Sequence, residues 1–189
     1  MNKLITIGIT LVLILTVGFF LFQKNEPQKT TSKQTNTSTE QQSIEESPKI
    51  GFRAPSFSLT SLDNMTYSLK QTKGKPTVMF FWASWCPNCE ALSPELERLY
   101  EKYKAEMEVY SVNLTSQDSF DRATRFAEEH QFSFPVLLDE DGTVAQAYRV
   151  IGTPTTYFID KNGIIVDIVQ GAANPAQFTE KFEKLVNTN

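Results

Sequence analysis

The chain has 189 residues, of which 40% are hydrophobic, and its 18 basic and 22 acidic residues leave a formal net charge of -4. This length allows one domain with a substantial core plus additional segments. A nucleic-acid-binding protein would need a clustered basic face, so the slightly acidic balance predicts that the chain has no nucleic acid partner.

The chain begins with a long apolar run that contains no charged residue. It extends from Leu4 to Phe22, which is long enough for a helix that crosses a bilayer. A cleaved signal peptide has a shorter apolar core followed by a small-residue cleavage site, and this run offers neither. We predict a single-pass signal-anchor over residues 1–23, with a removed signal peptide as the alternative.

The next segment, residues 24–48, is rich in Thr, Ser, Gln, Asn, Glu and Lys. It has too few large apolar residues to offset the entropy cost of ordering, so we predict a flexible polar tether. Lysine counts on the two sides of the apolar run favour a cytoplasmic domain. An anchor with a very short leading tail nevertheless usually sends its long downstream domain across the membrane. We therefore expect the domain to lie on the extracytoplasmic side of the cell membrane.

From residue 49 onward the pattern is that of one folded domain. Segments 57–59 and 66–69 flank Asp63-Asn64 and predict a β-hairpin. The continuous apolar run 76–82 is typical of a strand buried on both faces. The further predicted strands are 107–114, 135–138, 155–159 and 164–169, the last two joined by a hairpin turn at 160–163.

Helical patterns alternate with these strands. The predicted helices run from the cysteines to Tyr103, over 118–130, over 144–148 and over 175–186. Pro94 should kink the first helix, Asp118 is the predicted N-cap of the second, and His130 should complement the dipole at its end. This order predicts an α/β fold with a largely parallel sheet, helices on both faces and a closing antiparallel hairpin.

Cys86 and Cys89 are the only cysteines of the chain and lie between a predicted strand and a predicted helix. With no other thiol to pair with, they are predicted to exchange two electrons with an outside partner, without an organic cofactor. Free N–H groups and the dipole at a helix start favour the thiolate, which is the attacking form. Pro87 suits the first helical turn, and the N–H groups of Asn88 and Cys89 can point toward the Cys86 sulfur. Cys86 is the predicted exposed nucleophile, and Cys89 the thiol that resolves the mixed disulfide.

Four further residues are predicted to surround this pair. Trp82 and Trp85 should be core and rim residues that frame Cys86, with plain packing as the alternative. Gly152-Thr153-Pro154 reads as a turn before a strand. A cis bond before Pro154 would leave the Thr153 backbone free to pair with an extended substrate peptide, although the sequence does not reveal the isomer.

Taken together, these motifs resemble the thioredoxin superfamily. The resemblance rests on Trp-Ala-Ser-Trp-Cys-Pro-Asn-Cys at 82–89, on Pro94, and on Gly-Thr-Pro-Thr-Thr-Tyr-Phe-Ile-Asp at 152–160. Ala-Pro-Ser-Phe-Ser-Leu at 54–59 and the extra helix–strand segment 118–139 narrow it to the TlpA/ResA-like membrane-anchored thiol–disulfide oxidoreductases, a branch close to the AhpC/TSA redoxins. The resemblance covers roughly residues 50–187.

The resemblance implies a thioredoxin fold over residues 49–189, with an N-terminal β-hairpin extension and an inserted helix–strand segment. It also implies that Cys86 and Cys89 are the redox pair and that Pro154 is the cis proline. The implied partners are exported proteins with thiols or disulfides, often apocytochrome c, and a membrane thiol carrier that supplies electrons. We expect a monomer.

Two departures from the family pattern bear on the direction of electron flow. Relatives usually have Pro immediately before the second cysteine, whereas Pro87 follows the first, as in the more oxidising DsbA-like group. Phe80 stands where thioredoxins have a buried Asp, and Leu92 stands where some ResA-like proteins have a Glu. We expect Glu90 and Glu95 to be solvated. Reduction of exported disulfides remains the favoured prediction, with oxidation of exported thiols as the alternative.

Several other functions of the cysteine pair are less consistent with the sequence. Zinc would need two more ligands, so we predict no metal site. A Sco-type copper chaperone would want a wider cysteine spacing and a well-placed His. A peroxiredoxin-like peroxidase with antioxidant activity, suggested by Ala54-Pro55-x-Phe57, would need a peroxidatic cysteine in a setting that is missing. A purely structural disulfide would close too short a loop. A non-enzymatic module that binds exported peptides along the Thr153 edge is the alternative from another class.

Overall fold

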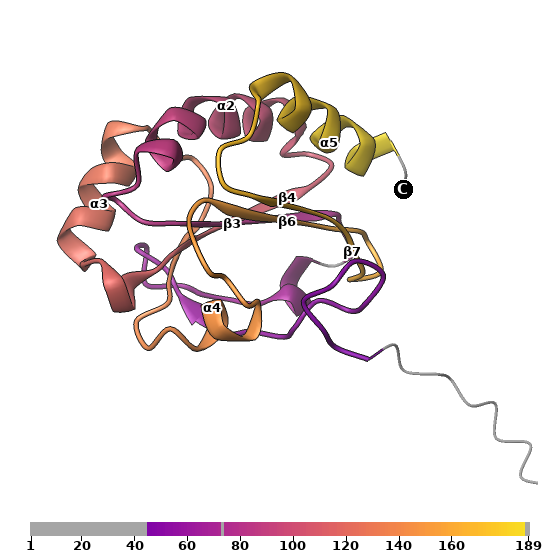
Figure 1. Cartoon of the computed structure of the whole chain (residues 1–189), viewed down its shortest axis with the longest axis horizontal. Helices are drawn as coiled ribbons and strands as arrows, with labels where there is room; N and C mark the ends of the chain where they lie inside the picture. The colour runs from indigo at the N-terminus through magenta and orange to yellow at the C-terminus, as the bar shows by residue number, and fades with distance from the viewer. Residues whose placement is uncertain (1–44, 73, 188–189) are drawn as a thin grey trace, which may run out of the picture. The chain divides into compact units, whose positions relative to one another are not determined.

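The computed structural model describes residues 45–72 and 74–187 (Figure 1). The predicted signal-anchor and residues 24–44 of the predicted tether lie outside the described residues. Within 45–72 and 74–187, no helix is both long and apolar enough to cross a membrane. The last residues of the predicted tether belong to the fold, because the Glu46 carboxylate accepts hydrogen bonds from the Ser56 N–H (3.1 Å) and the Ser56 hydroxyl (3.3 Å).

A five-stranded mixed sheet forms the centre of the domain, with the strand order β5-β4-β3-β6-β7. Its parallel half consists of β3 (Thr77–Trp82), β4 (Glu108–Asn113) and β5 (Val136–Leu138). Its antiparallel half consists of β6 (Thr155–Ile159) and β7 (Ile165–Gln170), and β6 also runs antiparallel to β3. The predicted strands and closing hairpin are thus confirmed. Gly163 closes the hairpin turn at a positive φ of 80°, a conformation that favours glycine.

The predicted N-terminal hairpin forms a separate two-stranded sheet. It pairs β1 (Leu59–Thr60) with β2 (Thr66–Tyr67), with Leu59 opposite Tyr67. Asn64 adopts a positive φ of 62° in its turn, a conformation that Asn tolerates better than most residues. A short 3₁₀ helix, η2 (Leu69–Thr72), follows the hairpin.

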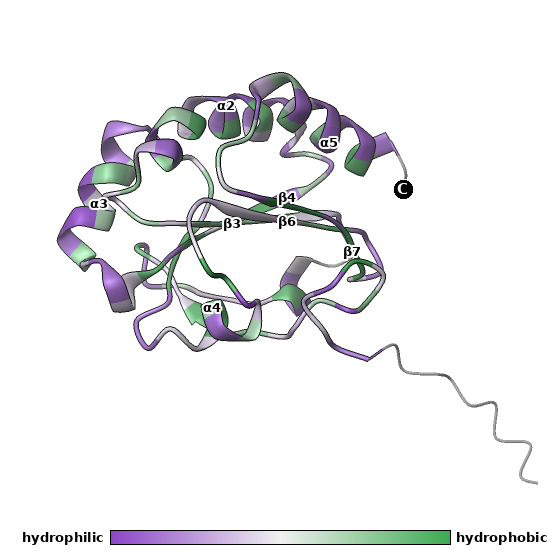
Figure 2. Cartoon of the chain, viewed as in Figure 1, coloured by the Kyte–Doolittle hydropathy of each residue, from purple (hydrophilic) through white to green (hydrophobic). Residues whose placement is uncertain are grey.

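In the described part of the chain, four α-helices cover the sheet: α2 (Pro87–Tyr103), α3 (Phe120–Glu129), α4 (Thr143–Ala147) and α5 (Pro175–Asn187). Figure 1 shows α2 and α5 together on one side of the sheet and α4, with the N-terminal part of the domain, on the other. Figure 2 shows that the apolar residues of these helices turn toward the sheet. The α/β fold with helices on both faces is therefore confirmed.

The core has two parts, one on each face of the sheet, because successive strand residues point to opposite faces. Val78, Phe80 and Trp82 of β3 pack beneath α2, whereas Met79 and Phe81 pack on the α4 side. Every residue of β3 is buried, as its continuous apolar run predicted. This burial anchors the end of β3, where the cysteine loop begins.

One predicted detail of the helices differs from the structure. Ser119, not Asp118, is the N-cap of α3, since the Ser119 Oγ accepts the Arg122 N–H (3.4 Å). The Asp118 carboxylate instead accepts hydrogen bonds from the N–H and hydroxyl of Ser84. The helix α2 runs through Pro94 as one helix of 17 residues, and the kink at Pro94 stays a prediction.

Candidate active site

The two cysteines lie at the junction of β3 and α2. Cys86 is the N-cap of α2, in an extended conformation with φ -95° and ψ 107°, and Pro87 begins the helix. The Cys89 N–H donates to the Cys86 Sγ (3.2 Å), and the N–H groups of Cys89 and Glu90 also approach the Cys86 carbonyl oxygen (3.0 and 3.1 Å). Negative charge on the Cys86 sulfur would thus face a helix N-terminus and a directed N–H donor.

Cys86 and Cys89 form a disulfide whose Cα atoms are 5.2 Å apart. Cys86 is only 4% exposed and Cys89 is fully buried. Cys86 was expected to be exposed, so in this oxidised form it is more enclosed than predicted. What little of the pair reaches solvent belongs to Cys86, which makes it the sulfur that an outside thiol can approach.

The surroundings of the buried sulfur are apolar. Phe80 and Leu92 are both buried in the same cluster as the cysteines. Glu90 is exposed, as expected. Glu95 is not simply solvated, because it binds Arg98 through two hydrogen bonds (2.8 and 2.7 Å) and Thr179 through another (2.5 Å). The Arg98 hydrogen bonds lower the pKa of Glu95, despite an opposing effect of burial, so its carboxylate is held ionised rather than poised to accept a proton.

The two tryptophans occupy different environments. Trp82 is fully buried and stacks on Phe126, with ring centroids 4.5 Å apart, and its indole Nε1 has no hydrogen-bond partner within the described part of the chain. Trp85 is 54% exposed, and its indole N–H donates to the Gln117 carbonyl oxygen (3.1 Å). Trp82 is therefore a core residue and Trp85 a surface residue of this loop, while their part in the reaction stays a prediction.

The Pro154 turn lies at the same edge of the sheet as the cysteines. In the antiparallel pairing of β3 with β6, Phe81 is opposite Thr155, so the turn before β6 is level with the loop that follows β3. The Thr153–Pro154 peptide bond is cis. Pro154 is buried and Thr153 half-buried, whereas Ile151 is 89% exposed. The pairing of Thr153 with a substrate peptide stays a prediction.

The connection between β4 and α3 contributes a buried carboxylate that was not predicted as part of the site. Asp118 accepts hydrogen bonds from the N–H (2.6 Å) and hydroxyl (2.7 Å) of Ser84, two residues before Cys86. The side chain of Asp118 is 0% exposed. Burial opposes its ionisation, but hydrogen bonds from Asn113, Ser84 and Arg122 outweigh burial and lower the pKa of Asp118. No local pattern signals a contact between residues 34 positions apart.

Among residues 45–72 and 74–187, no group of three or more His, Cys, Asp or Glu side chains could hold a metal ion. The arrangement suits a different chemistry. One sulfur at a helix N-terminus, with a buried partner sulfur one helical turn away, can form and break a disulfide with an outside thiol.

Comparisons with known proteins agree with this chemistry. The model of the AhpC/TSA family matches residues 50–168. The thioredoxin-like protein YneN of Bacillus subtilis is 37% identical over 134 residues, which cover 70% of this chain and 78% of YneN. The thiol-disulfide oxidoreductase ResA of Geobacillus kaustophilus is 30% identical over 179 residues, which cover 94% of this chain and 92% of that protein.

Solved structures agree as well. A putative thiol:disulfide interchange protein DsbE from Chlorobium tepidum superposes with a TM-score of 0.66 at 30% identity, covering 74% of this chain and 96% of that one. StoA from Bacillus subtilis superposes with a TM-score of 0.58 at 25% identity, covering 67% and 96%. The chain therefore belongs to the AhpC/TSA family and is a thiol–disulfide oxidoreductase with a thioredoxin fold.

Proposed function

We propose that this protein is tethered to the membrane and reduces disulfides in exported proteins, such as apocytochrome c, outside the cytoplasm. The observation that carries the proposal is the geometry of the pair. Cys86 caps α2 and its sulfur accepts the Cys89 N–H, while Cys89 is fully buried behind it. The uncharged run from Leu4 to Phe22 supports the tether. ResA of Geobacillus kaustophilus, which matches nearly the whole chain, supports the type of reaction.

The proposed cycle begins with the dithiol form. The Cys86 thiolate attacks a substrate disulfide, a mixed disulfide forms, and one substrate sulfur leaves as a thiolate that takes up a proton. Cys89, once deprotonated, attacks the Cys86 Sγ, releases the second substrate thiol and closes the disulfide seen in the structure. A membrane thiol carrier then returns two electrons, with two protons from solvent. Because Cys89 is buried, its attack is confined to Cys86.

The Cys89 N–H supports both halves of this cycle. It faces the Cys86 sulfur at 3.2 Å, where negative charge resides before the attack on substrate. Negative charge develops on the same sulfur again at the end of re-reduction. A first carrier thiolate attacks the Cys86 Sγ and Cys89 departs; a second carrier thiolate then attacks the carrier sulfur of this mixed disulfide, so that the carrier disulfide forms and Cys86 leaves as a thiolate. A charge-assisted hydrogen bond at this position is worth about 1.5–3 kcal/mol.

Cysteine variants test the reaction itself. We expect Cys86→Ser to abolish insulin reduction, and Cys89→Ser to accumulate mixed disulfides that identify the substrate by mass spectrometry. In a module that only binds peptides, Cys86→Ser would retain the physiological partner and Cys89→Ser would trap none. Retention of the partner by Cys86→Ser, together with no mixed disulfide in Cys89→Ser, would contradict the proposal that the protein is an oxidoreductase of exported proteins.

A fusion experiment tests the location. Alkaline phosphatase fused after Asn189 is active only when it is exported, because it needs disulfides that form outside the cytoplasm. We expect an active fusion in the membrane fraction of a bacterial host. A fusion in which residues 1–23 are deleted should be inactive. An inactive full-length fusion that is nevertheless expressed would contradict the proposed orientation.

Oxidation of exported thiols is the second candidate. It is favoured by Pro87 directly after Cys86 and by the apolar Phe80 and Leu92 around the buried sulfur. The midpoint potential of the full-length protein, measured against glutathione, distinguishes reduction of exported disulfides from oxidation of exported thiols. A value near that of thioredoxin, about -270 mV, supports a reductant, and a value near that of DsbA, about -120 mV, supports an oxidant.

A further inference from the structure

The loop that presents Cys86 is held by a distant part of the chain. The Ser84 N–H and hydroxyl donate to Asp118 at 2.6 and 2.7 Å, and the Trp85 indole N–H donates to the Gln117 carbonyl oxygen at 3.1 Å. At the start of the loop, the Leu114 N–H donates to the Trp82 carbonyl oxygen at 2.9 Å. The connection 114–118 between β4 and α3 therefore contacts Trp82, the last residue of β3, and the loop residues Ser84 and Trp85 that lead into Cys86.

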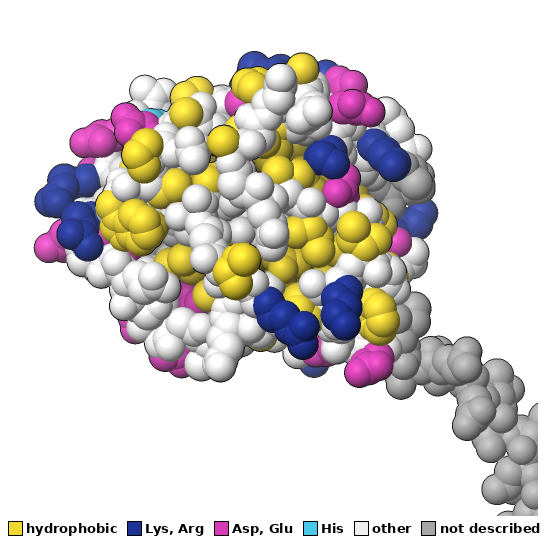
Figure 3. Space-filling view, viewed as in Figure 1, with side chains coloured by type: hydrophobic (Ala, Val, Ile, Leu, Met, Phe, Trp, Pro, Cys, Tyr) yellow, Lys and Arg dark blue, Asp and Glu magenta, His cyan; other side chains and the backbone are white. Residues whose placement is uncertain are grey.

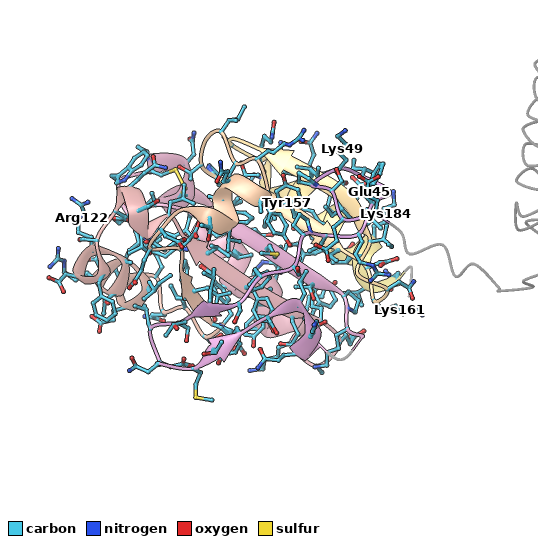
Figure 4. The ribbon with its side chains drawn as sticks, turned by 90° about the horizontal axis from the view of Figure 1, so that it is seen from below. Glu45, Lys49, Arg122, Tyr157, Lys161 and Lys184 are labelled. Carbon is cyan, nitrogen blue, oxygen red and sulfur yellow. A yellow bond between two sulfur atoms is a disulfide. The ribbon has the colours of Figure 1, made fainter. Side chains whose placement is uncertain are left out.

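Asp118 is the centre of this arrangement. Its carboxylate also accepts hydrogen bonds from the Asn113 side-chain amide (3.0 Å), the Ser119 N–H (2.9 Å) and the Arg122 Nε (3.0 Å). Asn113 is itself fully buried, whereas Arg122 lies at the outer margin of the domain, where Figure 4 shows it far from Lys49 and Lys161. The buried carboxylate thus accepts hydrogen bonds from the cysteine loop, from the end of β4 and from the start of α3.

A carboxylate buried this completely is costly unless hydrogen bonds and a cation compensate it. Five donor groups do so here, and two of them come from Ser84 in the loop. Charge-assisted hydrogen bonds are both stronger and more directional than neutral ones. They restrict Ser84, and with it the course of the backbone to Cys86, two residues later.

We propose that Asp118 is a positioning residue for thiol–disulfide exchange: it fixes the 83–86 loop so that the Cys86 sulfur stays beside Cys89. Closure of a disulfide depends on the effective concentration of one thiol at the other, and order in the connecting backbone raises that concentration. A looser loop would favour the dithiol form over the disulfide form. It would therefore raise the midpoint potential and slow the attack of Cys89 on a mixed disulfide. This role holds whichever way electrons flow.

The test uses Asp118→Asn in the purified full-length protein. Asn has nearly the same size, but its side chain is uncharged and one of its two polar groups is an NH₂ donor. This NH₂ group would face the N–H and O–H donors that now bind the carboxylate. We expect the equilibrium constant with glutathione to move about fivefold to tenfold toward the dithiol form, which corresponds to a rise of roughly 20–30 mV. Release of substrate from the mixed disulfide should slow by a similar factor.

Asp121→Asn is the matched control, because it is the same substitution three residues away, on an exposed residue in the first turn of α3. It should leave the equilibrium constant within about 1.5-fold of the wild-type value. If Asp118 stabilised the oxidised and reduced forms equally, its replacement would lower the unfolding temperature without changing the midpoint potential. A folded Asp118→Asn protein with the wild-type potential would therefore overturn the proposal.

Ser84→Ala gives a second, milder test, since it removes the hydroxyl bond and keeps the backbone bond to Asp118. We expect a shift of about twofold to threefold in the same direction. In the double variant, the combined shift should be smaller than the sum of the single shifts on a logarithmic scale, because the two residues act through one contact. Additive shifts would contradict the proposal. If Asp118→Asn fails to fold, Ser84→Ala decides alone, and an unchanged potential would then reject the positioning role.

Discussion

At the scale of single residues, the proposed chemistry depends on two sulfurs whose environments differ although they are three positions apart. Cys86 caps α2, is 4% exposed and has an N–H donor directed at its sulfur, whereas Cys89 lies within the helix and is fully buried. The sequence predicted this difference, because strand, proline and helix patterns around the pair are local. It did not reveal Asp118, since a contact to Ser84 is a property of the tertiary fold.

A pH experiment tests the ionised state of Asp118. Because its pKa is lowered in the folded protein, the unfolded chain takes up the proton first as the pH falls. The contribution of Asp118 is therefore complete above the ordinary range of Asp, near pH 4, and is lost as the pH falls below it. We expect the free energy of unfolding of Asp118→Asn to decline less steeply between about pH 5 and pH 3 than that of the wild type, in urea titrations. Parallel curves for the two proteins would contradict an ionised, hydrogen-bonded Asp118.

At the scale of elements, the strands and helices were predicted to within one or two residues. The run 76–82 corresponds to β3 (Thr77–Trp82), and 175–186 to α5 (Pro175–Asn187), because burial and periodicity mark both ends. The start of α3 was misplaced by two residues. Asp118 is a good N-cap residue by type, but its carboxylate is used by Ser84, and Ser119 caps the helix instead. Local propensity was overridden there by a tertiary contact.

A core substitution tests the strand that carries the site. Phe80 is fully buried in β3 beneath α2. Phe80→Ala should lower the free energy of unfolding by about 3–5 kcal/mol, because it removes buried apolar surface and leaves a cavity. Val166→Ala on β7, where the side chain is exposed, should cost less than about 1 kcal/mol. Equal losses for the two variants in denaturant titrations would show that Phe80 is not the tightly packed residue described here.

At the scale of the whole molecule, the described domain is a scaffold that brings two loops to one edge of its sheet. The register of β3 with β6 places the Pro154 turn level with the cysteine loop, and large apolar side chains near both loops reach solvent. In the view of Figure 3, apolar and uncharged atoms cover much of the middle of the face, and basic side chains gather at its left, upper right and lower right. A protein partner can therefore bury apolar surface when it docks.

Ile151, which is 89% exposed in the Pro154 turn, provides the test of such docking. Ile151→Ser should raise the KM for insulin about tenfold, since burying an aliphatic side chain is worth roughly 1.5–3 kcal/mol. The rate with a small aromatic disulfide should be unchanged, because that substrate needs no docking surface. Val166→Ser serves as the control on β7. A matching loss of rate with both substrates would indicate damage to the redox pair instead of lost docking.

The proposed mechanism requires that Cys86 is the sulfur that exchanges with outside molecules. The most direct measurement is brief alkylation of the reduced full-length protein with limiting iodoacetamide at neutral pH, followed by mass spectrometry of the peptide that holds both cysteines. We predict that the label is found on Cys86 at a rate well above that of a free cysteine, because its thiolate faces the α2 N-terminus and the Cys89 N–H. A label found first on Cys89, or at the rate of free cysteine on Cys86, would contradict the account.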